Sequence, residues 1–400
     1  MSDAASEAMT AAMSPPAPAS SDDAPVERAP SSGRIASLDA LRGLIMVLML
    51  LDHARGFFLH ADLGDPIALD RVSRALFFQR LVTHLCAPTF IVLAGLSAYL
   101  YGRKHGGVGA ASAFLAKRGV FLVVLEATVI TYAWTFGTHS FIFQVIWAIG
   151  ASMIGLAALI HLPRPVLLAV GLALVLGHNL TDPLDAIWSD QPAWILLHAG
   201  GRIPLPFDWS IRLAYPALPW LGIMTLGYFV GPWFTPEIPV NTRRRRLLFV
   251  ASGALGLFAV LRLVNGYGDP EPWAPGSSGL EAMMSFVNVS KYPPSADYAL
   301  LTLGVATLLF LGLDRVNPHH LSGLVVFGAV PLFFYVAHLY LLHAASVLAG
   351  RALGLPGDFA VESAPALWPI AIAAGVPLWL LCRWVAKKKR ASRAAWTSYL

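Results

Sequence analysis

Long apolar stretches follow one another along most of the chain, and each has about the length of a helix that crosses a membrane. A membrane-spanning helix needs about 20 mostly apolar residues. We therefore predict an all-α, polytopic integral membrane protein with about ten transmembrane helices. The predicted helices lie near residues 38–58, 84–102, 119–136, 141–160, 164–180, 212–233, 246–265, 297–313, 323–348 and 366–386.

Both ends of the chain depart from this pattern. Residues 1–33 are rich in Ala, Ser, Pro, Asp and Glu, and they lack the basic and apolar regions of a cleaved signal peptide. Such a composition cannot bury a core, so we expect a disordered cytoplasmic tail there. Residues 34–386 are predicted to form one transmembrane domain, and residues 387–400 a basic cytoplasmic tail.

The composition excludes most soluble classes of protein. Hydrophobic residues make up 56% of the 400 residues and charged residues only 13%, about half the charged share of a soluble protein. A soluble enzyme, a secreted scaffold and a DNA-binding domain are therefore excluded, and we expect no nucleic acid partner. Cys86 and Cys382 lie in or beside apolar runs and indicate no disulfide framework.

The basic residues predict an orientation. With the N-terminus in the cytoplasm, 18 of the 28 Lys and Arg residues fall on the cytoplasmic side and 9 on the other. Cytoplasmic loops carry the excess of positive charge, so we expect both termini in the cytoplasm. The two longest loops, near 181–211 and 266–296, then lie on the extracytoplasmic side, where binding residues are expected.

The first predicted helix carries ionisable residues. A charged residue at the centre of a spanning helix costs roughly 2.5–3.5 kcal/mol, so such residues are functional candidates. Arg42 and His53 are 11 residues apart, which places them on one helix face about 16 Å apart along the axis. Asp52 lies about 100° around the helix from His53 and is expected to orient a different partner. The alternative is that Arg42 reaches the headgroups and His53 only packs.

Two further positions lie at the predicted extracytoplasmic entrance. His84 precedes the second predicted helix and is expected near His53. Lys291 and Tyr292 precede a double proline, which fixes an extended backbone and would hold both side chains at the membrane face. An isolated histidine at such a place is either functional or structural.

Ionisable residues also interrupt two later helices. Glu126 in the third predicted helix must pair or stay protonated, and we expect a hydrogen bond with Arg42 or a histidine. Tyr335 and His338 share a face of the ninth predicted helix. His338 is either functional or satisfied by an interhelical hydrogen bond.

Several familiar motifs are absent from the sequence. There is no G-x-x-x-x-G-K-[ST] loop, no H-E-x-x-H and no G-x-S-x-G. The adjacent pair His319-His320 is expected to be solvated in a loop, so we expect no metal site. No internal repeat supports an inverted-repeat transporter.

Four segments along the chain carry a recognisable pattern. They are Ser37–Gly43 with Asp52-His53, Ala87–Gly95, Lys291–Ser295 with Thr302–Gly304, and Pro331–His338. In this order they resemble the heparan-alpha-glucosaminide N-acetyltransferase-like proteins, including their bacterial members. The Arg42 to His53 interval is also similar to the R-x10-H motif of the wider transmembrane acyltransferases that O-acylate surface sugars.

The resemblance implies acyl transfer across a membrane by a transmembrane acyltransferase-like domain over residues 34–386. The likeness to the bacterial members implies a location in a bacterial inner membrane. Acetyl-CoA or another acyl-CoA would enter from the cytoplasm, and its acyl group would pass to a sugar amine or hydroxyl on the other side. The implied partners are acyl-CoA, a carbohydrate acceptor and membrane lipids, and a homodimer stays open. The family's key histidine lies in the first extracytoplasmic loop, where this chain has only His60, so His53 or His84 would take its role.

The residue chemistry agrees with this reaction. Acyl transfer needs a base for the acceptor proton, and histidine serves best near neutral pH. His53 is the first candidate, His84 the second, and Asp52 completes the catalytic set. Donors for the thioester oxyanion are expected among Lys291, Tyr335 and Arg42. The expected ligands of the CoA phosphates are Arg42, Lys117, Arg118, Arg164 and Arg315, and the expected substrate-binding residues are Lys291, Tyr292, Tyr335, His338 and Glu126.

Two other classes of function stay open. A proton-coupled transporter would use Asp52, His53, Glu126 and His338 as a relay, and an assembly protein would use its polar residues only to hold helices together. An acyltransferase consumes a thioester, whereas a carrier moves solute without consuming one.

Overall fold

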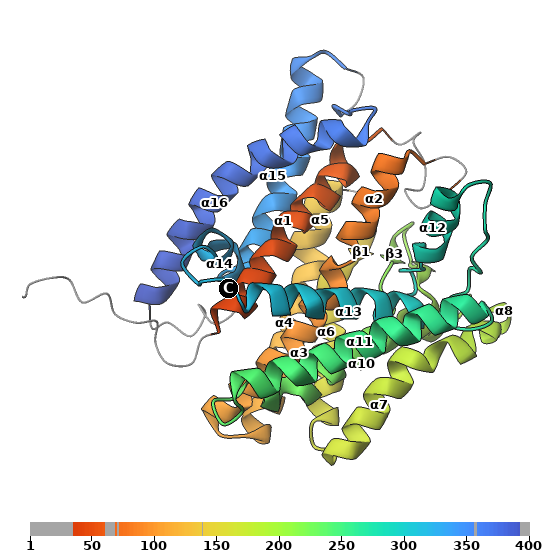
Figure 1. Ribbon diagram of the computed structural model, residues 1–400. Coiled ribbons are helices and arrows are strands. Elements are labelled where there is room, and N and C mark those ends of the chain that lie inside the picture. Colours follow the sequence, from red (N-terminus) through yellow and green to blue (C-terminus); the bar gives the residue numbers. More distant parts are fainter. Residues whose placement is uncertain (1–34, 61–68, 70–71, 138, 356–357, 393–400) are drawn as a thin grey trace, which may run out of the picture. The chain divides into compact units, whose positions relative to one another are not determined.

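The computed structural model consists mainly of helices, which are joined by short connections and by two long loops (Figure 1). It describes residues 35–60, 69, 72–137, 139–355 and 358–392, so the predicted N-terminal tail and most of the predicted C-terminal tail lie outside the described residues. The α-helices are α1 Ala36–Phe58, α2 Arg74–Thr83, α3 Cys86–His105, α4 Val108–Leu125, α5 Thr131–Thr135, α6 Val145–Leu159, α7 Arg164–Leu176, α8 Asp185–Trp188, α9 Pro192–Trp194, α10 Ala217–Val230, α11 Val240–Val264, α12 Gly279–Val287, α13 Ala296–Leu313, α14 Ser322–Gly328, α15 Pro331–Ala352 and α16 Leu367–Ala391.

Within the residues that the structure describes, six helical segments are long and apolar enough to cross a membrane, and α7 with the turns that follow it forms a seventh if a bend of 46° is allowed. The chain is therefore an all-α integral membrane protein. The six segments are Arg74–His105, Val108–Thr135, Val240–Val264, Ala296–Leu313, Pro331–Ala352 and Ala364–Ala391.

The predicted count of ten spans is not confirmed. Each of the ten predicted stretches overlaps a helix. However, α6, α7 and α10 contain only 15, 13 and 14 residues, which is short for a membrane core. Helix α1 is 23 residues long but includes four charged residues. The ninth predicted stretch divides into α14 and α15, because Pro331 begins a new helix.

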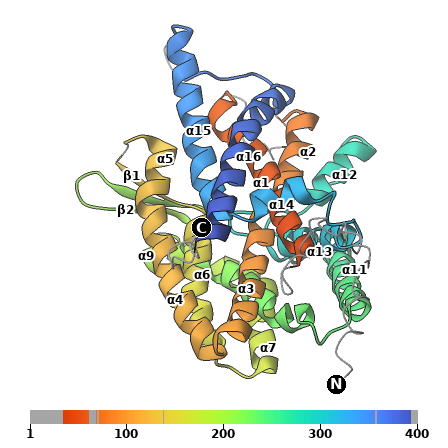
Figure 2. The ribbon, with the colours of Figure 1, turned by 90° about the vertical axis from the view of Figure 1, so that its left-hand side faces the viewer.

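Helix α1 packs against α2, α3, α13, α14, α15 and α16, and the two ribbon views show it beside α15 and α16 (Figures 1 and 2). Its closest approach is to α14. A Cβ atom on Gly43 would lie 1.9 Å from the Leu324 carbonyl oxygen, and one on Gly328 would lie 1.9 Å from that of Asp39. Small residues allow such close backbone contact between membrane helices.

A small three-stranded sheet was not predicted from the sequence. Strand β1 (Ser140–Phe143) pairs in parallel with β3 (Ser210–Leu213), and β2 (Gly201–Pro204) pairs antiparallel to β3. Strands of four residues are too short to give a clear alternating pattern. The sheet joins the start of α6 to the long loop before α10, and it leads directly into Tyr215.

The second long loop is held in place by a buried arginine at the end of α11. The Arg262 guanidinium donates hydrogen bonds to four backbone carbonyls of the loop, at 2.8–3.1 Å. Asp269 in turn accepts hydrogen bonds from Ser290 and Ser295. The segment that carries Lys291 and Tyr292 is thus fixed between α12 and α13.

Candidate active site

Asp52 of α1 forms a buried ion pair with Arg80 of α2. Arg80 Nη1 lies 2.8 Å from each carboxylate oxygen, and the two side chains are 6% and 11% exposed. Thr83 Oγ1 also donates to Asp52 at 3.1 Å, and Arg55 Nε at 3.4 Å. Asp52 therefore orients Arg80, and not the adjacent His53, in agreement with its predicted offset around the helix.

The sequence analysis missed Arg80, because it placed this residue in a loop. In the structure, α2 starts at Arg74 and continues almost directly into α3. A signal was present: Arg80, Thr83 and His84 occupy positions i, i+3 and i+4, which share one helix face. The helix was missed because its first turn, which begins at Arg74, is polar and precedes the apolar span of α3.

Two tyrosines and a lysine extend this cluster. Arg80 Nη2 donates to the Tyr292 hydroxyl at 3.3 Å, and the hydroxyls of Tyr292 and Tyr215 lie 3.4 Å apart. Lys291 Nζ lies 5.1 and 5.7 Å from the ring centroids of Tyr292 and Tyr215. Lys291 is only 4% exposed, and within the described residues it has no carboxylate partner.

These cations change the acidity of Tyr292. Burial opposes ionisation of its phenol, but the charges of Lys291 and Arg80 outweigh burial and lower the pKa of Tyr292 to about 7. Tyr292 as a whole is 47% exposed, so solvent screens part of this effect. Burial raises the pKa of the neighbouring Tyr215 well above its usual value. Three cations, Arg55, Arg80 and Lys291, thus surround one carboxylate, and the site favours negative charge.

A pair of histidines joins α1 to α15. His53 Nδ1 lies 2.6 Å from His338 Nε2, and His338 Nδ1 lies 2.8 Å from the carbonyl oxygen of Phe334. A carbonyl only accepts, so the neutral His338 carries its proton on Nδ1 and accepts at Nε2. His53 consequently donates from Nδ1, which leaves the lone pair of its neutral form on Nε2. The rings of Trp134 and Tyr335 contact His53 edge-on, with centroids at 5.1 and 5.9 Å.

His84 lies in a different environment from His53. It is 2% exposed, and neither ring nitrogen has a hydrogen-bond partner in the described part of the chain. Its ring contacts Tyr298, which donates to the His84 carbonyl at 2.8 Å. His60 lies just beyond α1, where its amide donates to the Val361 carbonyl at 3.1 Å.

The expected partner of Glu126 was wrong. This fully buried carboxylate accepts hydrogen bonds from the backbone amides of Gln144 and Trp147, at 2.9 and 3.0 Å. It therefore caps the N-terminus of α6, where free amides favour a carboxylate. Its partners are these backbone amides and not the expected Arg42 or histidine side chain. Its geometry suits a structural role better than substrate binding.

Arg42 lies in the first turns of α1 with two polar partners. Its guanidinium donates to Asp39 at 2.9 Å and to Ser97 of α3 at 2.5 Å. The side chain is 21% exposed. Arg42 is thus part of a helix–helix contact, and any phosphate would share it with Asp39.

The contacts of the other four expected CoA ligands involve different helices and do not join these residues into one cluster. Lys117 is exposed on α4, and Arg118 lies over an aromatic ring of the same helix. Arg164 donates to a carbonyl of α10, and Arg315 donates to a carbonyl at the end of α13. These contacts lead to separate places on the bundle.

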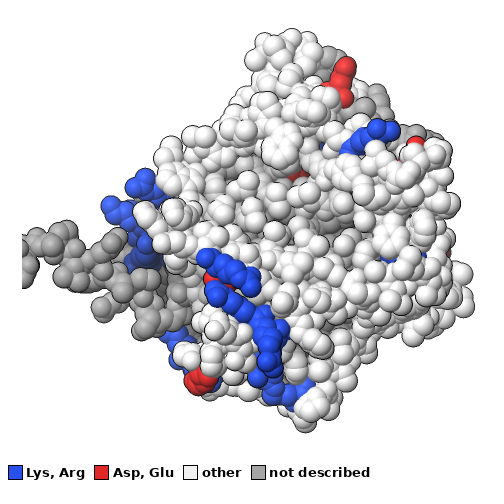
Figure 3. Space-filling model, in the orientation of Figure 1, with Lys and Arg blue, Asp and Glu red and all other residues white. Residues whose placement is uncertain are grey.

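A more concentrated group of arginines lies at the start of α11. Arg243 and Arg244 both donate to the Asp314 carboxylate, at 2.7–3.0 Å, and Ser37 of α1 donates to it at 2.9 Å. Figure 3 shows basic side chains gathered over this region and near the end of α16, while much of the remaining face carries no charge. The sequence analysis had used these arginines only for orientation.

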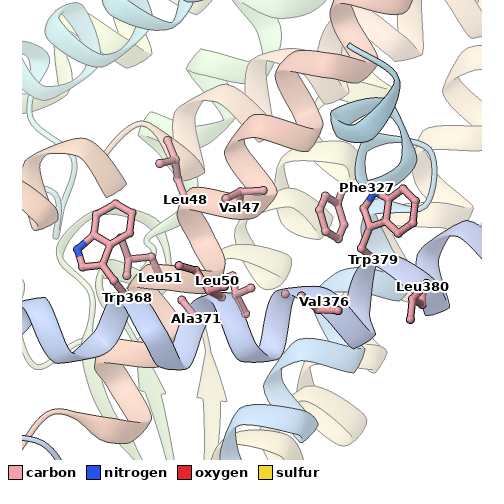
Figure 4. A pocket seen from close by; sticks show the side chains of 12 residues that line it. Val47, Leu48, Leu50, Leu51, Phe327, Trp368, Ala371, Val376, Trp379 and Leu380 are labelled. Atoms are coloured by element: carbon pink, nitrogen blue, oxygen red, sulfur yellow. The ribbon is translucent and has the colours of Figure 1, made fainter. Parts of the chain in front are cut away.

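An apolar cavity of about 490 Å³ lies apart from these polar groups, between α1 and α16 (Figure 4). None of the candidate catalytic residues lines it. The lining residues are Val47, Leu48, Leu50 and Leu51 of α1, Phe327 of α14, and Trp368, Ala371, Ile372, Gly375, Val376, Trp379 and Leu380 of α16. Such a surface suits acyl chains of the surrounding lipid better than acyl transfer.

Metal ligands are scattered in the part of the chain that the structure describes. No group of three His, Cys, Asp or Glu residues there has a geometry that would hold a metal ion. Cys86 and Cys382 are both buried and free.

Comparison with protein families gives one match. The family model described as heparan-alpha-glucosaminide N-acetyltransferase, catalytic, matches residues 34–258, which is more than half of the chain. The match includes Asp52, His53, Arg80 and Trp134, whereas Lys291, Tyr292, Tyr335 and His338 lie beyond it. A comparison with curated proteins gives no significant match.

Proposed function

Because the chain belongs to the heparan-alpha-glucosaminide N-acetyltransferase family, we propose that it transfers an acetyl or other acyl group from acyl-CoA to a sugar amine or hydroxyl. Acyl-CoA enters from the cytoplasm, and the acceptor binds on the extracytoplasmic side. The orientation follows from the distribution of basic residues. Reporter fusions after residues 275 and 390 test it, with the first expected outside and the second in the cytoplasm.

The single observation that carries this proposal is the hydrogen-bonded pair of His53 and His338 beside a cluster of cations. The pair presents the Nε2 lone pair of His53, because Nδ1 is occupied by His338. His53 directly follows Asp52 in α1, and the Asp52 carboxylate binds both Arg80 and Arg55. A base that faces a positively charged site suits a reaction in which negative charge develops.

The proposed reaction takes place at His53 Nε2. The acceptor nitrogen or oxygen attacks the thioester carbon while His53 takes its proton. The carbon–sulfur bond then breaks, the CoA thiolate leaves with the electron pair, and His53 returns the proton to the sulfur. The bond from Nδ1 to His338 holds the imidazole ring in place throughout.

The remaining residues are proposed to bind and position. Lys291 and Tyr292 hold the acceptor, and Asp52 keeps Arg80 directed toward Tyr292. His84 is the second candidate for the base. On the donor side, Arg42 is proposed to meet a CoA phosphate.

The donor side extends beyond Arg42. Lys117, Arg118, Arg164 and Arg315 are proposed to add positive potential at the cytoplasmic entrance. The pantetheine arm would then extend along α1 over the roughly 16 Å that separate Arg42 from His53.

The test uses the purified protein in detergent with acetyl-CoA and an amino sugar such as glucosamine. We expect release of the free CoA thiol together with the acetylated sugar, detected by mass spectrometry. Acetyl-CoA should also co-purify or bind to the protein. Intact acetyl-CoA in this assay, together with solute uptake into liposomes that needs no thioester, would show that the protein is a carrier instead.

A further inference from the structure

Two buried hydrogen-bond donors lie beside His53 without an acceptor among the described residues. They are the Trp134 indole nitrogen and the Tyr335 hydroxyl, and both atoms are shielded from solvent. Their rings meet the His53 ring edge-on, at interplanar angles of 76° and 84°. Buried donors are nearly always satisfied in folded proteins, so two unsatisfied donors at one side chain require an explanation.

The two donors come from different helices that meet at α1. Trp134 lies in α5, at the end of the span that begins with α4, and Tyr335 lies in the first turns of α15. The Trp134 indole N–H approaches the Tyr335 hydroxyl closely enough to act on it as a donor, but the two atoms fall short of the geometry of a hydrogen bond, and both lack a partner among the described residues. A third atom that accepts from both would satisfy the pair.

Packing holds both donors in position. The Trp134 indole stacks on Phe57 at 4.9 Å, and Phe57 stacks on His343 at 5.0 Å. Tyr335 is 3% exposed, and its ring contacts His338 edge-on at 5.5 Å. The donors are thus fixed before any ligand arrives, which is the arrangement that stabilises developing charge most effectively.

The chemistry of the two groups specifies the ligand atom. An indole N–H can only donate, so its partner must be an acceptor such as a carbonyl oxygen. An attacking amine or hydroxyl instead needs a proton acceptor, which His53 Nε2 supplies. The three side chains therefore separate the two reactants of an acyl transfer, one on the donors and one on the base.

We propose that Trp134 and Tyr335 form the oxyanion site for the thioester carbonyl of acyl-CoA, an inference that rests on the proposed function. As the acceptor attacks the carbonyl carbon, the π-electron pair moves to the carbonyl oxygen, and both donors bind the resulting oxyanion. The pair of electrons then re-forms the C=O bond while the carbon–sulfur bond breaks. Sequence analysis named Tyr335 for this role but gave no reason to choose Trp134.

The test removes each donor atom and keeps an aromatic ring at each position. Trp134→Phe and Tyr335→Phe are expected to lower kcat of acetyl transfer by about 10²-fold each, the typical loss for one oxyanion donor. The dissociation constant for acetyl-CoA and the melting temperature should stay near wild type. Tyr340→Phe on the same helix, whose hydroxyl donates to Val129 at 2.9 Å, and Trp384→Phe on α16 are matched controls and should keep wild-type kcat.

A spectroscopic readout separates this role from a merely structural one. In His53→Ala protein, which holds acetyl-CoA without turning it over, the isotope-labelled thioester carbonyl should absorb at lower infrared frequency than in water. Adding Trp134→Phe or Tyr335→Phe should shift the band back upward, and Tyr340→Phe should not. Unchanged bands and near-wild-type kcat in both Phe variants of an active enzyme would overturn the oxyanion site but leave the proposed function standing. A wild-type protein that neither binds nor cleaves acetyl-CoA would overturn both.

Discussion

The two ends of α1 carry similar numbers of charged residues but use them differently. At the end that begins with Ala36, Arg42 binds Asp39 and Ser97. Nearby, Asp314 accepts from Ser37, Arg243 and Arg244. Burial works against ionisation of Asp314, but the hydrogen bonds from Arg244 and Ser37 and the charge of Arg243 keep its pKa below the usual value. Each carboxylate at this end is matched by cations.

At the opposite end, one carboxylate faces several cations, and some polar atoms are unmatched within the described residues. Asp52 binds Arg80, but Lys291 has no carboxylate, and the donors of Trp134 and Tyr335 have no acceptor. At the first end Arg243 Nε also lacks a partner among the described residues, but Asp39 and Asp314 are both paired there. An unmatched buried group costs about 1–3 kcal/mol. The difference indicates that the first end, around Arg42 and Asp314, holds helices together, and we call it the closed end. The second, around Asp52 and His53, is built for a ligand, and we call it the open end.

The largest expected effect tests whether both ends depend on their ion pairs in the same way. Arg80→Met would leave the buried Asp52 with the Thr83 hydroxyl and, as its remaining cation, the long contact to Arg55. Breaking a buried pair from one side costs about 3–5 kcal/mol. Arg243→Met should cost much less, because Asp314 keeps Arg244 and Ser37. Thermal unfolding in detergent measures both variants.

A double variant provides the control for this comparison. Asp52→Asn with Arg80→Met should recover part of the lost melting temperature, since no unpaired charge stays buried. Equal losses for Arg80→Met and Arg243→Met would contradict the claim that the two ends are organised differently.

The second prediction concerns His53, the base at the open end. His53→Ala should lower turnover at least about 10²-fold, the lower figure for loss of a general base, while acyl-CoA binding and the melting temperature stay near wild type. Wild-type turnover should also fall on acidification, because only the neutral imidazole accepts a proton. Steady-state kinetics across a pH series measure both effects.

Histidine controls decide which residue is the base. His319→Ala, in an exposed loop, should behave as wild type. If His53→Ala keeps near-full turnover and His84→Ala abolishes it, the base is His84. If neither change matters with a known acceptor, the mechanism proposed for the open end is wrong.

The sequence predicted the helices better than the contacts among them. Each stretch predicted from apolar length overlaps a helix, although the count of ten spans is not confirmed. Helix geometry predicted that Asp52 points away from His53. Which helices become neighbours is not encoded in a one-dimensional pattern, so the contact of His53 with His338 could not be derived. Glu126 was assigned the wrong partner because backbone amides leave no signature in the sequence.

The third prediction concerns Arg42 at the closed end. If Arg42 also meets a CoA phosphate, Arg42→Ala should weaken acyl-CoA binding about tenfold or more, since hydrogen bonds to charged groups contribute roughly 1.5–3 kcal/mol. Arg42→Lys should restore affinity only in part, because a point charge replaces a bidentate donor.

Calorimetric titration with acetyl-CoA measures the affinities, and exposed Arg245→Ala is the control. Unchanged affinity in a folded Arg42→Ala protein would leave Arg42 with a purely structural role and sharpen the contrast between the ends.

The smallest expected effect is the titration of Tyr292 at the open end. Its pKa of about 7 in the folded protein lies below the usual value of about 10, so the native state binds fewer protons than the unfolded state between these pH values. Stability should therefore rise with pH across this window relative to Tyr292→Phe, and the gain should be lost as pH falls through about 7. The gain is modest because Tyr292 is 47% exposed and solvent screens its charge interactions.

Ultraviolet absorbance should show one tyrosine ionising near neutral pH in wild type and in Tyr215→Phe, but not in Tyr292→Phe. Lys291→Met should move the midpoint upward, because it removes the cation that lowers the pKa most. A wild-type titration with no ionisation below about pH 9 would mean that the cations do not act on Tyr292, and the open end would then lack the positive potential on which acceptor binding is proposed to depend.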